Sequence, residues 1–148
     1  MIKAVIHVGI TVKDLDTVVG FFRDTLGLNK IWQEYTYRGK TIEKLTGLSG
    51  AHVRVVKIDL ENTIVELVQY LSPLGREYQL NPNDIGCTHV CFEVDNIDEM
   101  YENLCQKGVK SMSGPVTISN AESPMYGWKS IYFQGPEHIT IELQQRPS

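Results

Sequence analysis

Apolar and polar residues alternate along several short stretches of the chain, which is typical of β-strands with one buried face. In the first of these stretches, Ile6, Val8, Ile10 and Val12 occupy every second position. Similar patterns predict strands near residues 3–12, 30–38, 51–59, 63–70, 86–94, 111–117, 128–134 and 138–144. Two longer runs each follow a short acidic turn and precede a glycine, which predicts helices near 15–26 and 97–107. The pattern therefore predicts an α+β protein.

These elements repeat once along the chain. The stretch HVGITVKDLDTVVGFFRDTLGL, which starts at His7, matches HVCFEVDNIDEMYENLCQKGV, which starts at His89. The two halves also end alike, because TIVELVQ contains Glu66 and HITIELQQ contains Glu142. Each half reads as a strand, a helix and about three strands. We therefore expect one domain, residues 1–148, made of two β-α-β-β-β modules at about 1–72 and 85–146, with a linker near 72–85.

One histidine and one glutamate in each half point away from the apolar face of their strand. Strand alternation places His7 and His89 in this way, and it does the same for Glu66 and Glu142. Taken alone, such residues are more often surface or hydrogen-bonded side chains than ligands. The repeat gives both halves the same pair, so approximate two-fold pairing of the modules would bring all four together. Two imidazoles and two carboxylates suit a borderline divalent metal ion and leave room for water or substrate.

The stretch GCTHVCFEV also carries two cysteines beside one of these histidines. Cys87 and Cys91 share the face of His89, but residues two apart on a straight strand are about 6.6 Å apart. Metal–nitrogen and metal–sulfur bonds are about 2.0–2.3 Å long. Neighbours on one strand therefore do not readily share a metal ion. We expect both cysteines to line the wall of the pocket as small apolar side chains.

Composition narrows the classes of function. The 148 residues carry a formal net charge of −4, without the basic stripe typical of a nucleic-acid binder. No apolar run approaches the roughly 18 residues of a membrane span, and no signal-peptide pattern begins the chain. Three cysteines predict free thiols in a reducing compartment. We expect a cytoplasmic protein that binds neither nucleic acid nor a membrane.

The repeated motifs resemble the vicinal oxygen chelate superfamily, which includes glyoxalase I, methylmalonyl-CoA epimerase, extradiol dioxygenases and bleomycin-resistance proteins. The resemblance covers nearly the whole chain and rests on HVGITVKDLDTVVGFFRDTLGL, TIVELVQ, HVCFEVDNI and GPEHITIEL. It implies the glyoxalase/bleomycin-resistance/dioxygenase fold, in which paired modules form a curled mixed sheet around a metal. It also implies that His7, Glu66, His89 and Glu142 bind one divalent ion, which is Ni, Co, Zn, Mn or Fe.

The ligand set is similar to that of small bacterial glyoxalase I, a lactoylglutathione lyase. Methylmalonyl-CoA epimerases usually have Gln at the position of Glu66, although HVCFEVDNI is similar to their sequences. Extradiol dioxygenases use two His and one Glu, and drug-binding resistance proteins lack the metal set. Because GPEHI stands where glyoxalases often have DPDGY, the substrate stays open between glutathione and CoA thioesters. The alternatives to a lyase are therefore an epimerase-like isomerase, an extradiol-type dioxygenase and a non-catalytic drug-binding protein.

For a lyase or an epimerase-like isomerase, the resemblance implies a small-molecule substrate with vicinal oxygens. A proton beside a carbonyl is removed and returned, while the metal stabilises the enediolate. Glu142 is the first candidate for the base and Glu66 is the second. Arg54, Tyr70 and Arg76 are further candidates for substrate contact. We expect a homodimer, whose modules pair within one chain or swap between subunits, and in which Trp32, Tyr35 and Tyr37 serve packing or the dimer interface.

Overall fold

The structure is a computed structural model that describes residues 1–147. The chain divides into two compact units, with the boundary in the sequence between Tyr78 and Gln79. We call them the N-terminal unit and the C-terminal unit. Each contains its own mixed sheet and its own helix against that sheet.

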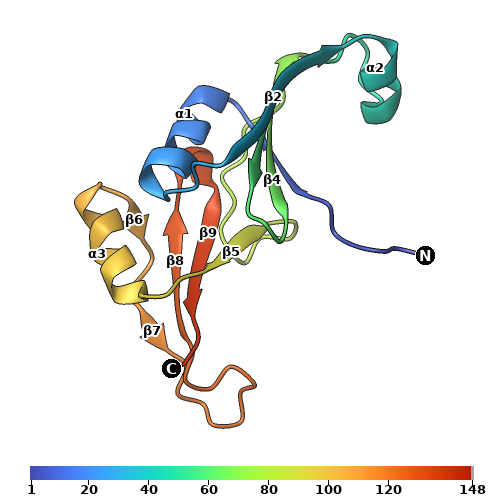
Figure 1. Cartoon of the computed structure of the whole chain (residues 1–148). Helices are drawn as coiled ribbons and strands as arrows, with labels where there is room; N and C mark the ends of the chain where they lie inside the picture. The colour runs from blue at the N-terminus through green and yellow to red at the C-terminus, as the bar shows by residue number, and fades with distance from the viewer. Residues whose placement is uncertain (148) are drawn as a thin grey trace. The chain divides into compact units, whose positions relative to one another are not determined.

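The N-terminal unit consists of a four-stranded sheet with the order β1-β4-β3-β2. Its elements are β1 (Val8–Val12), α1 (Leu15–Gly20), a π-helical turn (Phe21–Thr25), β2 (Ile31–Arg38), α2 (Lys40–Thr46), β3 (His52–Asp59) and β4 (Ile64–Ser72). Strand β1 runs parallel to β4, and the other neighbours are antiparallel. Figure 1 shows α2 as a separate teal helix beyond the end of β2.

The C-terminal unit repeats this plan with a five-stranded sheet. Its elements are β5 (His89–Glu93), α3 (Ile97–Gln106), β6 (Lys110–Ser111), β7 (Val116–Thr117), β8 (Lys129–Gln134), a 3-10 turn (Pro136–His138) and β9 (Thr140–Gln145). The order is β5-β9-β8-β6, with β7 also paired to β8. Strand β5 is parallel to β9, as β1 is to β4, and β8 and β9 lie side by side in Figure 1.

Helix α1 covers one face of the N-terminal sheet, where it contacts β3 and β4. Asp14 caps the helix, because its carboxylate accepts hydrogen bonds from the backbone N–H and the hydroxyl of Thr17. Leu15 and Val18 of the helix and Phe22 of the following turn are fully buried. The burial of this apolar stripe fixes which face of the sheet the helix covers.

Helix α3 covers the equivalent face of the C-terminal sheet, where it contacts β6 and β9. Asn96 caps it by accepting a hydrogen bond from the backbone N–H of Glu99 at 3.2 Å. Ile97 and Leu104 are fully buried. The strands contribute Ile131, Phe133, Ile141 and Leu143 to the same core. Each unit therefore holds one helix on one sheet face by burial of apolar side chains.

The structure differs from the sequence-based expectation in three places. Helix α2 was not predicted; it lies between Gly39 and Gly47, whose positive φ angles of 102° and 70° favour glycine.

The single strand predicted over 111–117 is two short strands, since Pro115 between them has no backbone N–H for a ladder. The first strand begins at Val8, so His7 directly precedes it.

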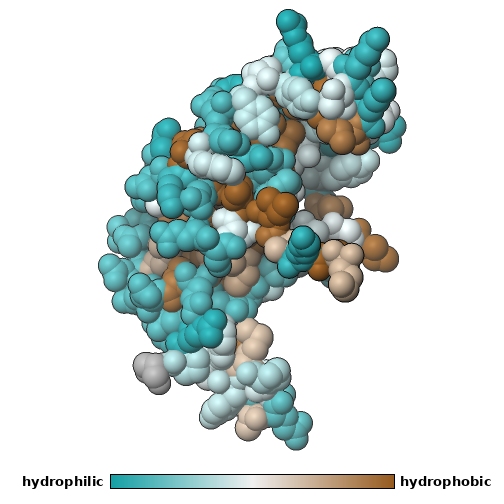
Figure 2. All heavy atoms as spheres, turned by 45° about the vertical axis from the view of Figure 1, so that its right-hand side comes forward, coloured by the Kyte–Doolittle hydropathy of each residue, from teal (hydrophilic) through white to brown (hydrophobic). Residues whose placement is uncertain are grey.

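Strand β2 forms an open edge of the N-terminal sheet, and none of its residues is buried. Its exposed apolar side chains are Ile31, Trp32, Tyr35 and Tyr37. Figure 2 shows hydrophobic atoms, in brown, at the surface among hydrophilic ones. Such an edge suits an interface, and the expected homodimer stays a prediction. Among residues 1–147, no helix is long and apolar enough to cross a membrane.

We expect Leu104→Ala to lower the free energy of unfolding by about 2–5 kcal/mol, because it opens a cavity beneath α3. Glu102→Ala, at an exposed position of the same helix, is the control and should change stability by less than about 0.5 kcal/mol. Urea denaturation followed by circular dichroism measures both. Equal losses for the two variants would contradict this packing of α3.

Candidate functional site

In the N-terminal unit, the parallel pair of β1 and β4 brings His7 next to Glu66. Val65 and Leu67 of β4 are fully buried on the side of α1, so Glu66 between them faces the other side of the sheet. The register places Glu66 beside Gly9, two residues after His7. The Nε2 atom of His7 lies 3.7 Å from Oε1 of Glu66. An imidazole and a carboxylate therefore share the face of the sheet that α1 leaves uncovered.

Lys57 joins this pair from β3. It lies directly opposite Glu66 in the antiparallel register, and its Nζ is 3.3 Å from Oε2 of Glu66. The ammonium is also 5.9 Å from the ring centre of Trp32 and 5.8 Å from that of Tyr35. Burial lowers the pKa of Lys57, but the contacts with Glu66 and Tyr35 outweigh it and leave the pKa raised. Sequence reasoning missed this residue, although alternation from Val53 and Val55 places Lys57 on their face.

In the C-terminal unit, β5 and β9 bring His89 next to Glu142 in the same way. Glu142 is only 6% exposed and stands between Ile141 and Leu143, which are buried on the side of α3. The Nε2 atom of His89 lies 3.1 Å from Oε2 of Glu142. The ring of Tyr132 packs edge-on against that of His89, with 5.3 Å between their centres. The second imidazole and carboxylate thus repeat the arrangement of the first.

Neutral donors hold the buried Glu142 carboxylate. Its Oε1 accepts hydrogen bonds from the hydroxyl of Ser130 at 2.7 Å and from Nε2 of Gln144 at 2.8 Å. Burial raises the pKa of Glu142, but the hydrogen bonds from Ser130, Gln144 and Tyr132 and the charge of His89 bring the pKa below its ordinary value. The carboxylate is therefore ionised at neutral pH without a lysine or arginine beside it.

Cys91 lies beside Glu142 in the parallel register of β5 and β9. Partial burial of the thiol, followed by the charge of Glu142, raises the pKa of Cys91 to about 12. The raised pKa disfavours the thiolate, which is the form of cysteine that binds metal ions. Cys87 precedes β5 and has no disulfide partner.

The two pairs fit a divalent metal ion in their chemistry. Imidazole nitrogen and carboxylate oxygen are both ligands of borderline divalent ions. Each unit supplies one of each, with the histidine just before or at the start of a strand and the glutamate within its parallel neighbour. Within residues 1–147, no group of three or more His, Cys, Asp or Glu side chains gathers closely enough to hold a metal ion.

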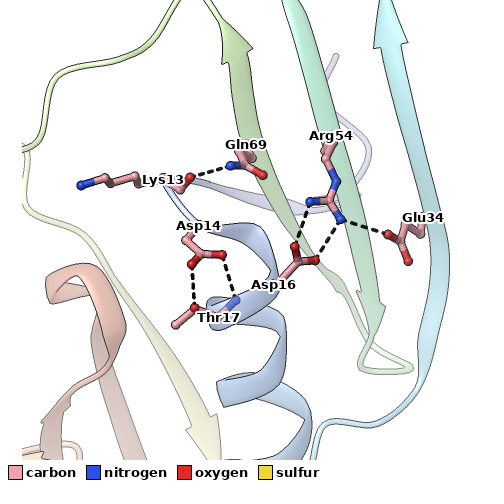
Figure 3. Close-up of polar contacts among 7 residues, drawn as sticks. All are labelled: Lys13, Asp14, Asp16, Thr17, Glu34, Arg54 and Gln69. Atoms are coloured by element: carbon pink, nitrogen blue, oxygen red, sulfur yellow. Dashed lines mark hydrogen bonds and ion pairs between the residues drawn. The ribbon is translucent and has the colours of Figure 1, made fainter.

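The structure places Arg54 on the opposite face of the sheet from Glu66. Its guanidinium donates to both carboxylate oxygens of Asp16, at 3.0 and 2.9 Å, and approaches Glu34 at 3.5 Å. Figure 3 shows Arg54 between Asp16, at the start of α1, and Glu34. Its partner in the register is Gln69, whose amide donates to the backbone carbonyl of Lys13. Arg54 therefore joins the helix to the sheet on the side that α1 covers.

The other two candidates for substrate contact lie at and beyond the end of β4. Tyr70 is half-buried and pairs with Val53, so strand alternation places it on the face of Glu66. Arg76 follows β4 and is exposed. The structure thus brings Tyr70 to the face of the His7–Glu66 pair and Arg54 to the other face.

Residues 6–126 match the Glyoxalase/Bleomycin resistance protein/Dioxygenase superfamily. The chain belongs to this superfamily. The resemblance to the vicinal oxygen chelate superfamily is therefore confirmed. The predicted α+β fold is confirmed as well, because each unit contains a mixed sheet.

Members of the superfamily with assigned names are similar over most of the chain. A 2-epi-5-epi-valiolone epimerase from an Actinomyces species is 31% identical over 98% of this chain and 80% of its own length. The mitochondrial methylmalonyl-CoA epimerase of Mus musculus is 32% identical over 94% of this chain and 71% of its own. Both relatives are named as epimerases, which supports an enzyme of the superfamily.

Solved structures agree with the fold. A glyoxalase family protein from Bacillus cereus superposes with a TM-score of 0.85 at 25% identity, covering 100% of this chain and 97% of its own. The fosfomycin resistance protein FosX from Listeria monocytogenes, solved with Mn(II) and sulfate, superposes with a TM-score of 0.57. Its identity of 20%, over 98% of this chain and 93% of its own, supports the fold alone.

The Asp16–Arg54 pair predicts a pH-dependent contribution to stability. The hydrogen bond from Arg54 lowers the pKa of Asp16 below its ordinary value of 3.8. A carboxyl group with a lowered folded-state pKa stabilises the fold above its unfolded pKa, and this contribution is lost as the pH falls through the folded pKa. We expect Arg54→Met to be less stable than the wild type near neutral pH, and the difference to shrink below about pH 3.8.

Denaturation midpoints measured between pH 7 and pH 2 test this expectation. Arg38→Met, at the exposed end of β2, is the control and should not show a difference that depends on pH in this way. A constant difference between Arg54→Met and the wild type over the whole range would contradict the role of this ion pair.

Proposed function

We propose that the protein is a metal-dependent isomerase that epimerises a small molecule at a carbon beside a carbonyl group. The observation that carries this proposal is the repeated pair of one histidine and one glutamate on parallel strands, His7 with Glu66 and His89 with Glu142. The relatives named as epimerases support an isomerase within the superfamily.

The four side chains would hold one divalent ion, Ni, Co, Zn, Mn or Fe, since all of these accept imidazole and carboxylate ligands. The ion would supply Lewis-acid polarisation of the substrate carbonyl. This arrangement needs the two pairs to meet, either within one chain, as a single domain of two modules, or between subunits of a homodimer. Two ionised carboxylates would balance the charge of a divalent ion.

The carboxylates would also move the proton. Glu142 would take the proton from the carbon beside the carbonyl, and the electron pair of the C–H bond would move toward the carbonyl oxygen. Hydrogen bonds from Ser130 and Gln144 to Oε1 orient the carboxylate for this step. Epimerisation returns a proton to the opposite face of the carbon. Glu66, on the other unit, is the candidate that would pass this proton on from solvent water, while the proton on Glu142 returns to solvent.

A lyase of the glyoxalase I type is the second candidate, and one observation favours it. Methylmalonyl-CoA epimerases usually have Gln at the position that Glu66 occupies in this chain. The two His–Glu pairs are instead similar to the ligand set of small bacterial glyoxalase I. The two functions share removal of a proton beside a carbonyl and differ in the carbon to which the proton returns.

We expect the purified protein to bind a divalent ion, and His7→Ala and Glu142→Gln each to weaken that binding by at least about tenfold. This size follows because loss of even an outer-shell partner costs about 10–100-fold in affinity. Glu102→Gln, at an exposed position of α3, is the control. Competitive titration with a chelating dye measures the affinities, and unchanged affinity in both ligand variants would contradict the assignment.

We also expect the metal-loaded protein to exchange the α-proton of methylmalonyl-CoA with deuterium from D₂O while it interconverts the epimers. Glu142→Gln should slow this exchange by about 10²–10⁴-fold, the usual contribution of general base catalysis. NMR follows the deuterium. Absence of exchange with this substrate and with valiolone-type ketones would overturn the epimerase proposal. Turnover of the methylglyoxal–glutathione hemithioacetal would support the lyase, and oxygen uptake with catechols would support a dioxygenase.

A further inference from the structure

The face of the N-terminal sheet that points away from α1 holds a cation that the proposed metal ligands do not explain. The side chain of Lys57 is only 18% exposed, although lysine side chains normally extend into water. Among residues 1–147, Glu66 is the one carboxylate within 4.0 Å of its ammonium. An ammonium group has three N–H donors. Glu66 and the hydroxyl of Tyr35 take at most two of them, which leaves one for a further oxygen.

Two aromatic rings help to fix the position of the Lys57 ammonium group. Trp32 and Tyr35 lie within 6 Å of the ammonium, at 5.9 and 5.8 Å from the ring centres. Rings at this distance attract a cation and hold it in place. The side chain is thus held next to Glu66 rather than spread over the surface of the sheet.

The equivalent position in the C-terminal unit lacks this charge. Tyr132 faces Glu142 across β8 and β9 in the register in which Lys57 faces Glu66 across β3 and β4. The Glu142 carboxylate is held by neutral donors from Ser130 and Gln144. The repeat therefore keeps the histidine and the glutamate in both units and differs where one unit has a lysine. Lys57 therefore lies outside the symmetric set of proposed metal ligands.

We propose that Lys57 binds a carboxylate of the substrate, so that the protein acts on an anionic acid rather than on a neutral ketone. The inference rests on the proposed function and narrows its substrate class. Of the two kinds of substrate named for the relatives, methylmalonyl-CoA carries a free carboxylate beside the reacting carbon, whereas 2-epi-5-epi-valiolone carries none.

A structural role for Lys57, limited to holding Glu66, leads to a different result. A lysine that only orients Glu66 would affect charged and uncharged ligands equally. A lysine that binds the substrate would discriminate between a carboxylate and its uncharged amide. Charge-assisted hydrogen bonds are strong enough to make this difference at least about tenfold in affinity.

The test compares malonate with malonamide as probes of protein from which metal has been removed by chelation and dialysis. Trp32 lies beside Lys57, and in a Trp128→Phe background common to all variants its fluorescence reports the binding. We expect malonate to bind at least about tenfold more tightly than malonamide, Lys57→Met to abolish this preference, and Lys57→Arg to retain most of it. Lys30→Met is the matched control, because Lys30 also pairs with a carboxylate, that of Asp59, in the same unit; it should leave the preference unchanged.

Equal binding of malonate and malonamide by the wild type would overturn the proposal without any variant, as would a preference that survives in Lys57→Met. In the metal-loaded protein, Lys57→Met should raise KM for methylmalonyl-CoA at least about tenfold and change kcat less. A loss confined to kcat would assign Lys57 to the orientation of Glu66 and overturn substrate binding. Failure of proton exchange in the wild type would overturn the proposed function, while the metal-free binding experiment would still decide the role of Lys57.

Discussion

The parallel pairing of the first and last strands of each unit is the constraint on which the rest of the structure depends. It sets β1 against β4 and β5 against β9, and it brings side chains from opposite ends of a half next to each other. Because side chains alternate across a strand, burial of the even or odd set under a helix sends the other set to the uncovered face. The pairs His7–Glu66 and His89–Glu142 arise in this way, from residues far apart in the sequence.

The two glutamates occupy different electrostatic surroundings in spite of the repeat. Glu66 has a half-buried ammonium group at 3.3 Å, whereas Glu142 accepts hydrogen bonds from neutral donors. The proposed ligand set is therefore symmetric in residue type and asymmetric in charge. An epimerase must hold its substrate in one orientation while a proton leaves one face of a carbon and another arrives at the opposite face. A charge on one side of the site would favour one orientation. In this account the lysine would set the orientation.

Much of this arrangement was predictable from the sequence. The repeat and the strand alternation predicted most strands and the sheet face of both histidines and both glutamates. This was possible because alternating apolar residues show which face of a strand is buried. The sequence could not decide which face of β3 the helix covers, since Val53 and Val55 on one face and Val56 and Ile58 on the other are all apolar and all buried. For this reason Arg54 attracted attention as a substrate contact, while Lys57 was missed. Helix α2 was overlooked because it has no buried residue to give it a periodic pattern.

The central claim is that the two His–Glu pairs together hold one metal ion. Pulsed electron paramagnetic resonance of the protein loaded with Mn(II) tests it most directly, because the hyperfine couplings count the imidazole nitrogens bound to each ion. The account predicts one ion per chain with two histidine nitrogens, and the loss of one of them in His7→Ala. Two ions per chain with a single nitrogen each, or an ion with no nitrogen ligand, would contradict it.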